Sequence, residues 1–202
     1  MNPKIMFIFF FITLGPIKVI LPFLNATANA NAHLRNMIAL RAFIISTTIV
    51  IILAVFGDKF TSNWNISKDS ISITGAIILF IWSLNVLLQQ LKPQKPPTPP
   101  EHPTLDLAAL PLTVPVIITP AGIAAILYFT MTAPKDNLSI MGIIIGLLIG
   151  VMLLNLMFML FARPITRIIG GAVTLQVAGS VLAVLQASLA IEILIKSIQR
   201  LI

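Results

Sequence analysis

Cysteine is absent from the 202 residues of this chain, and charged side chains make up only 9% of them. The lack of cysteine excludes disulfides and thiolate metal sites. A soluble domain carries about 25% charged residues, so a chain with so few charges could not cover a water-facing surface. The hydrophobic content of 58% and the mean hydropathy of +1.04 instead indicate an all-α polytopic membrane protein.

Acidic residues are also scarce, at six against 13 lysines and arginines. All of them except Glu192 lie in the polar segments between apolar runs, and no apolar run contains a histidine. This distribution excludes an intramembrane aspartyl pair, a zinc-binding H-E-x-x-H helix and a Ser-His dyad, and no P-loop is present. We therefore expect no enzyme activity, no metal and no other cofactor. The basic residues are scattered in ones and twos, which is typical of membrane flanks and not of a nucleic-acid surface.

Six apolar segments are long enough to cross a bilayer as helices. The connection LKPQKPPTPPEHPTLD is too rich in proline for a helix and is expected to be extended. It divides the chain into a first three-helix unit at 1–91, a linker at 92–106 and a second three-helix unit at 107–202. The predicted spans are 5–24, 36–57, 70–91, 107–132, 138–162 and 172–198.

The first span of each half is interrupted by a proline beside a small residue, at Gly15-Pro16 and at Thr119-Pro120-Ala121-Gly122. Such a break frees backbone groups that hydrocarbon cannot satisfy, which is tolerated only where they are buried in protein or line a cavity. Two breaks at matching positions are typical of secondary transporters, whose binding sites are built from broken helices. Because three spans per half would turn the second half upside down, we expect two inverted three-helix repeats with the first and fourth helices broken.

The first apolar segment has an alternative interpretation. Its basic start, apolar run and ATANANA sequence resemble a cleavable secretory signal. Its run of about 20 residues, against 7–15 in a signal, the interruption by Lys18 and its likeness to the fourth segment favour retention. The orientation in the membrane is not determined, because six lysines and arginines flank the spans on each side.

Four polar residues inside the spans each have a structural and a functional interpretation. Lys18 follows the first break and is expected either to snorkel to the interface or to reach water or a partner inside the membrane. Arg41 is expected either to anchor the interface or to act in gating or capping by hydrogen-bonding the freed carbonyls of a broken helix. Asn85 and Asn155 are expected to join helices or to face the substrate path.

Small residues at every fourth position form two stripes, which predict close packing between helices. The stripes are Gly142-x-x-x-Gly146-x-x-x-Gly150 in the fifth span and Gly179, Ala183 and Ala187 in the sixth. Near the end of the sixth span, Glu192 precedes Lys196 by four residues, so we expect a local ion pair there.

The breaks and their surroundings resemble the MarC family, which includes the SnatA neutral amino-acid transporters. Members share a first-span Asn-Pro or Asp-Pro with a phenylalanine seven residues later, and Pro16 and Phe23 keep that spacing. The second-span I-A-L-R-A stretch matches residues 38–42, and the glycine of the last span matches Gly179. The fourth-span motif, a proline and then Gly-Pro-Gly, matches Pro115 followed by the stretch at 119–121.

This chain departs from the family pattern at both breaks. Gly15 replaces the polar residue before the first proline, and Thr119 and Ala121 replace the two glycines of the second motif. The chain therefore lacks the side-chain amide or carboxylate that would contact substrate in the first break, and backbone groups would have to make more of the contacts with substrate.

The resemblance implies an inner-membrane, multi-pass carrier of small neutral amino acids such as glycine, alanine or serine, with both termini outside. The broken helices predict alternating access, with a zwitterion held by freed N–H groups and carbonyls. The alternatives are a carrier or exporter of another small solute, and a non-transporting membrane scaffold in which the breaks are only kinks. The expected partners are the amino acid and the lipid bilayer, and a homo-oligomer is open. The predicted substrate-binding residues are Thr13, Leu14, Gly15, Pro16, Ile17, Lys18, Ile118, Thr119, Pro120, Ala121, Gly122 and Asn85.

Overall fold

The computed structural model describes residues 2–64, 66–91, 100–133, 138–168 and 170–200, and helices are the only regular elements within these ranges. The predicted all-α fold class is therefore confirmed. Most of the predicted linker, residues 92–99, lies outside the described residues. The elements are α1 (Pro3–Leu14), α2 (Ile17–Ala26), α3 (Ala32–Asn63), α4 (Lys68–Leu91), η1 (Leu105–Ala108), η2 (Ala109–Ile117), α5 (Pro120–Thr132), α6 (Leu138–Leu160), α7 (Ala162–Ile168) and α8 (Ala172–Gln199).

Five stretches of the described chain are single membrane-crossing candidates by length and composition, and a sixth is a pair of helical pieces bent by 64°. The first stretch, Pro3–Ala26, contains both α1 and α2, and the bent pair is Leu105–Ile117 with Pro120–Thr132. All six predicted spans thus coincide with helical stretches. The short helix α7 was not predicted, because residues 163–171 were assigned to a connection.

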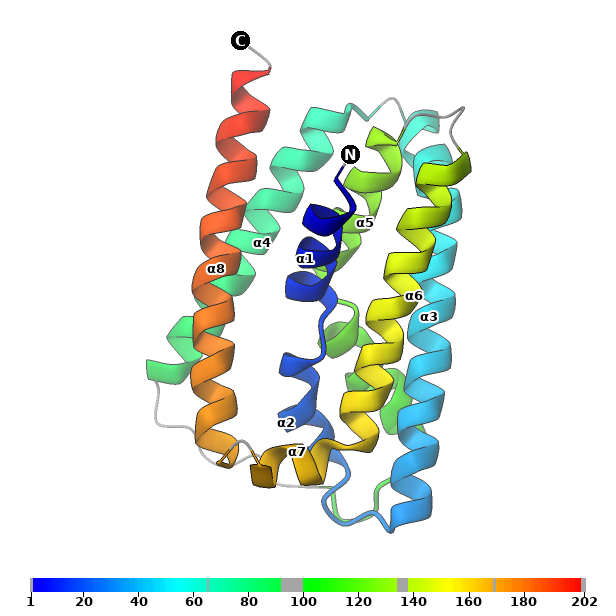
Figure 1. Cartoon of the computed structure of the whole chain (residues 1–202), viewed down its shortest axis with the longest axis vertical. Helices are drawn as coiled ribbons and strands as arrows, with labels where there is room; N and C mark the ends of the chain where they lie inside the picture. The colour runs from blue at the N-terminus through cyan, green and yellow to red at the C-terminus, as the bar shows by residue number, and fades with distance from the viewer. Residues whose placement is uncertain (1, 65, 92–99, 134–137, 169, 201–202) are drawn as a thin grey trace.

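The six stretches alternate in direction along the long axis of the molecule (Figure 1). The α1–α2 stretch runs from the upper end of the view to the lower end, α3 returns, and α4 runs down again. The second group starts at the lower end with η1 and η2, continues upward through α5, and finishes at the upper end with α8. The two groups of three therefore begin at opposite ends, as an inverted repeat requires, and the repeat itself stays a prediction.

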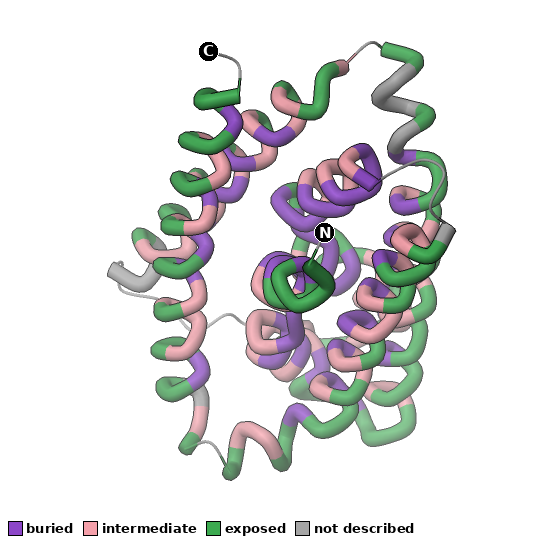
Figure 2. Tube along the Cα trace, turned by 45° about the horizontal axis from the view of Figure 1, so that its top comes forward, coloured by how far each residue is buried: buried purple, intermediate pink, exposed green. Residues whose placement is uncertain are grey.

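The broken first stretch lies in the middle of the bundle, and many of its positions are buried (Figure 2). Phe10, Leu14, Ile20 and Phe23 are completely buried although they come from both sides of the break. The ring of Phe129 on α5 packs edge-on against Phe10, with 5.2 Å between centroids. The part of this apolar stretch around the break is thus shielded by protein, whereas Ile5 and Ile8 near its start are exposed.

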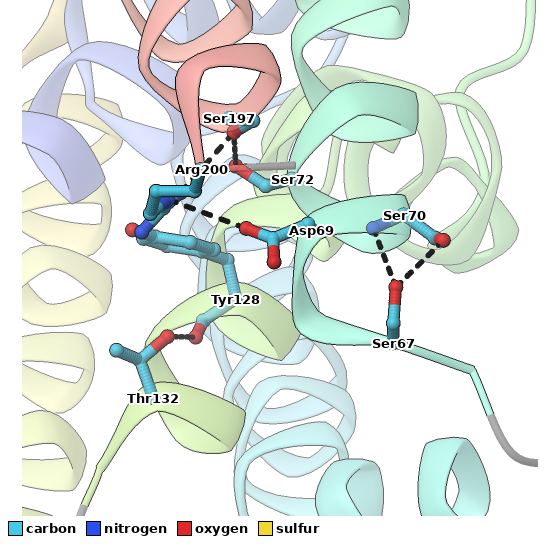
Figure 3. Close-up of polar contacts among 8 residues, drawn as sticks. All are labelled: Ser67, Asp69, Ser70, Ser72, Tyr128, Thr132, Ser197 and Arg200. Atoms are coloured by element: carbon cyan, nitrogen blue, oxygen red, sulfur yellow. Dashed lines mark hydrogen bonds and ion pairs between the residues drawn. The ribbon is translucent and has the colours of Figure 1, made fainter. Parts of the chain in front are cut away.

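Helices α4 and α8 lie side by side and run in opposite directions. Where α4 begins, the hydroxyls of Ser72 and Ser197 hydrogen-bond at 2.6 Å, and Arg200 pairs with Asp69 at 3.3 Å (Figure 3). These contacts fix the upper end of the α4–α8 pair, whereas its lower part borders the cavity described below.

The predicted ion pair between Glu192 and Lys196 is confirmed, at 2.8 Å on the exposed side of α8. The predicted close packing within the chain is wrong for Gly142, Gly146 and Gly150 and for Gly179 of the second stripe, whereas Ala183 of that second stripe is buried. A Cβ added at Gly142, Gly146, Gly150 or Gly179 would meet nothing within 4 Å. The close helix approaches occur instead at other glycines, such as Gly75, where a Cβ would lie 2.8 Å from that of Ala124 on α5.

Candidate functional site

The first break follows directly from Gly15 and Pro16. In a continuous helix the N–H of residue 16 would bond to the carbonyl of Ile12, but proline has no N–H to donate. Gly15 leaves the helix in an extended conformation (φ −73°, ψ 167°), and a Cβ at this position would overlap the carbonyl of Phe11. With α1 spanning about 18 Å at 1.5 Å per residue, the break lies near the middle of a bilayer.

Side chains from three helices and from the N-cap of α5 hydrogen-bond the carbonyls that the break frees at the end of α1. The amide of Gln186 on α8 donates to the carbonyl of Ile12. The Nδ2 of Asn155 on α6 donates to the carbonyl of Leu14 at 2.8 Å. The prediction that Asn155 joins helices is therefore confirmed.

The carbonyl of Thr13 accepts two side-chain donors. One is the Oγ1 of Thr119, at 3.0 Å, and the other is the Nζ of Lys18, which turns back across the break from α2. The end of α1 is thus satisfied by three neutral groups and one cation.

Thr119 also builds the second break. It is the N-cap of α5, where its Oγ1 accepts from the N–H of Gly122 at 3.1 Å, and Pro120 occupies the first helical turn, where no N–H is needed. A Cβ at Gly122 would overlap the side chain of Leu14, so only glycine allows the two breaks to approach this closely. One hydroxyl therefore caps α5 and bonds the end of α1, and the two breaks are in direct contact.

The segment before the second break is wound irregularly. Leu110 and Val114 have extended backbone angles inside η2, each directly before a proline, Pro111 and Pro115. A residue that precedes a proline is biased away from the α conformation, so the proline spacing accounts for both interruptions. Pro111 and Pro115 border the cavity that starts at the first break.

A cavity of about 900 Å³ extends from the first break to the end of the bundle where α2 stops. Gly15, Ile17 and Lys18 line it at the break, and Asn25 and Pro100 line it at the far end. This volume lies within the usual range of ligand sites, roughly 300–1,000 Å³. The remaining wall comes from α1, α2, α4, η1, η2 and α8, through Phe11, Ile12, Leu21, Pro22, Ala26, Trp82, Val86, Leu107, Pro111, Pro115, Val116, Leu175, Gln176, Gly179, Leu182, Ala183 and Gln186.

The cavity wall is electropositive at the break. The first N–H groups of a helix have no intrahelical partner, and the N–H groups of Ile17 and Lys18 find no acceptor among the described residues. The Nζ of Lys18 lies at the same place, and no carboxylate in the described ranges pairs with it. A helix N-terminus with free N–H groups favours an anion, so this end of the cavity fits a carboxylate.

On the other side of the break the bundle is closed. Phe9 and Phe10 of α1 pack edge-on against Phe129 of α5, with ring centroids 5.3 and 5.2 Å apart. Phe10 is completely buried, and Phe9 and Phe129 retain only 8% and 7% exposure. The described conformation is therefore hollow on the α2 side of the break and packed on the α1 side.

Comparison with known proteins assigns the chain to a family. A family model described as "MarC family integral membrane protein" matches residues 4–202. The chain belongs to the MarC family. A UPF0056 membrane protein from Archaeoglobus fulgidus is 26% identical over 186 residues, which cover 90% of this chain and 85% of the relative. UPF0056 membrane proteins from Buchnera aphidicola and Methanocaldococcus jannaschii are 24% and 26% identical and align over 52% and 57% of both chains, respectively. No solved structure matches.

Membership in the MarC family confirms the resemblance and makes the chain a multi-pass integral membrane protein. The predicted site residues of this MarC protein fall into three groups. Gly15, Ile17 and Lys18 line the cavity, while Asn85 lies on the exposed face of α4 and is not part of the wall. The third group lies where the two breaks touch or directly beside that contact, and it consists of Thr13, Leu14, Pro16, Ile118, Thr119, Pro120, Ala121 and Gly122.

Arg41 lies elsewhere in this MarC protein. Its side chain is on the exposed face of α3, and no carbonyl of the broken helices accepts from its guanidinium within the described chain. The capping that was predicted for Arg41 is performed by Lys18, Thr119, Asn155 and Gln186.

Gln186 was missed by the sequence reasoning, as was the placement of Gly179 in the cavity wall. The available signal for Gln186 was an amide inside an apolar span, the same signal that singled out Asn85 and Asn155.

Proposed function

We propose that this MarC protein is a secondary carrier of small neutral amino acids that works by alternating access around the paired breaks. The observation that carries the proposal is the cavity of about 900 Å³, whose wall contains the free N-terminus of α2 at the depth where two broken stretches meet. Broken helices that meet beside a cavity near the bilayer midplane are typical of secondary transporters.

The polar groups in the cavity wall match the two charged ends of an amino acid. A carboxylate fits the N–H groups of Ile17 and Lys18 together with the Lys18 ammonium, which has three donors and uses one on the Thr13 carbonyl. An amino group fits the Oε1 of Gln186, because this oxygen accepts no hydrogen bond from the described residues while the Nε2 of the same amide is held by Ile12. The rest of the wall offers mainly apolar surface, which suits a neutral side chain.

The asymmetry of the bundle supports alternating access. One side of the break is hollow, and the other is filled by the rings of Phe9, Phe10 and Phe129. The opposite starting directions of the two three-helix groups agree with inverted repeats, in which the two halves can exchange their open and closed arrangements. The structure described here corresponds in this proposal to the state open toward the end of α2.

Uptake into proteoliposomes tests the proposal. A panel of labelled amino acids is offered to liposomes with the purified protein and to protein-free liposomes. The uptake of each transported amino acid is then measured again in the presence of an excess of each other amino acid without label. We expect saturable uptake of glycine, alanine or serine, and we expect each of these three amino acids to inhibit the uptake of the others. A protein that gives no saturable flux above the protein-free control with any substrate would be a scaffold, and the proposal would be refuted.

The size of the cavity favours one second candidate, a carrier or exporter of a larger neutral solute. Glycine has five non-hydrogen atoms, which occupy on the order of 150 Å³ if each takes about the 30 Å³ of a liquid water. The cavity is several times larger. Competition by a larger apolar solute, with no competition by small amino acids, would support this second candidate over the first.

A further inference from the structure

We propose that Lys18 is a built-in counter-cation for the broken end of α1, so that the carrier holds its cation covalently and needs no bound sodium ion. The part of the inference that concerns transport without sodium rests on the proposed function. Its structural part concerns only the ammonium and the carbonyls around it.

A cation at the break would stabilise the end of α1. The C-terminal end of a helix carries roughly half a negative charge, and the end of α1 lies near mid-bilayer. Gln186, Asn155 and Thr119 satisfy its carbonyls as hydrogen-bond acceptors, but all three are neutral. Lys18 supplies the only positive charge that reaches these carbonyls within the described ranges.

Among the described residues, no acidic side chain forms an ion pair with the ammonium. The described acidic side chains that form ion pairs are Asp69, with Arg200, and Glu192, with Lys196, so neither is paired with Lys18. The α1 terminus is therefore the electrostatic partner of Lys18. The same ammonium lines the cavity, so a substrate carboxylate can share it with the Thr13 carbonyl.

A sodium ion occupies the equivalent position in carriers whose unwound carbonyls and half-helix C-termini coordinate Na⁺. In this chain the position beside the Thr13 carbonyl is taken by an ammonium that cannot dissociate. Removal of the ammonium would leave the oxygens of Thr13, Leu14 and Thr119 at the negative end of α1. Asn155 adds an Oδ1 that is buried and has no hydrogen-bond partner in the described chain. Such a set of oxygens suits a small alkali cation.

The test compares wild type, Lys18→Met and Lys68→Met in detergent and in proteoliposomes. Lys68→Met is the matched control, since it removes the same charge from an exposed position at the start of α4. The Tm is measured in sodium chloride and in choline chloride. We expect Lys18→Met to be less stable than wild type in choline and to regain about 5 °C in sodium, while wild type and Lys68→Met do not respond. Lys18→Gln, which keeps a donor for the Thr13 carbonyl, serves if Lys18→Met does not fold, and the same sodium response is expected.

Wild-type uptake supplies the second arm, with sodium replaced by choline on both sides of the membrane. We expect the initial rate to stay within about twofold, because no metal cation has to neutralise the α1 terminus. Sodium-dependent wild-type uptake, or a Tm of the Lys18 variants that does not distinguish sodium from choline, would overturn the inference. The Tm arm needs no flux, so it remains decisive for Lys18 even if no amino acid is transported and the proposed function fails.

Discussion

Replacing Thr119 by valine removes the hydroxyl that joins the two breaks while keeping the shape of the side chain. The hydroxyl makes two interactions, as acceptor for the N–H of Gly122 and as donor to the carbonyl of Thr13. Loss of an N-cap costs about 1 kcal/mol, and an interhelical hydrogen bond in a membrane is worth about 0.6 and at most roughly 1.7 kcal/mol. We therefore expect Thr119→Val to lower the free energy of unfolding by about 2 kcal/mol.

Thr13→Val is the matched control for this change. Thr13 is as fully buried as Thr119, but its hydroxyl donates to the carbonyl of Phe9 in its own helix, at 2.8 Å. Such back-bonding contributes little to helix stability, so Thr13→Val should stay close to wild type. In a chain of this size about 2 kcal/mol corresponds to roughly 4–8 °C in Tm, which thermal unfolding in detergent can resolve. Equal Tm values for the two variants would refute the reasoning that Thr119 couples the breaks.

Two further predictions concern residues away from the cavity wall. Arg41→Lys should insert and transport as wild type, because Arg41 is exposed and either cation can snorkel to the interface; a severalfold loss of uptake by a normally inserted variant would restore a capping role. Phe129→Ala removes the ring that Phe9 and Phe10 pack against and should cost about 3 kcal/mol of stability, the lower end for a buried phenylalanine. An unchanged Tm for Phe129→Ala would contradict the packed closure on the α1 side of the break.

The spans and the breaks could be predicted from the sequence because each has a local cause. Hydropathy over about 20 residues identifies a membrane helix, and Pro16 removes a backbone donor whatever its surroundings. The same local chemistry explains Pro120 at a helix start, whereas the extended residues before Pro111 and Pro115 were not predicted. The sequence also indicated that Asn155 joins helices, since an amide in hydrocarbon needs a partner.

The sequence could not predict which side of each helix faces lipid and which side faces protein. In a soluble helix the polar side identifies solvent, but in a membrane the lipid-facing and protein-facing sides are both apolar. The spacing of Gly142, Gly146 and Gly150 therefore looked like a packing stripe although these positions are open in the structure. Arg41 was given a partner it does not contact, and Gln186 was overlooked, for the same reason.

The partners of the freed carbonyls depend on tertiary structure in a similar way. Asn155 and Gln186 are more than 140 positions from the carbonyls that they bond. The sequence establishes that the carbonyls need donors, whereas the fold decides which side chains arrive. Lys18 is the exception, because it lies only five residues from Thr13 and can reach back across the break.

The central claim, that substrate passes through the cavity beside the breaks, is tested most directly by initial uptake rates of Gly179→Leu and Gly146→Leu in proteoliposomes. Both glycines have open space around them, but only Gly179 lines the cavity. We predict that Gly179→Leu inserts and folds normally and loses most of its saturable uptake, because the leucine fills the cavity, while Gly146→Leu transports as wild type. Wild-type uptake by a folded Gly179→Leu would contradict the account.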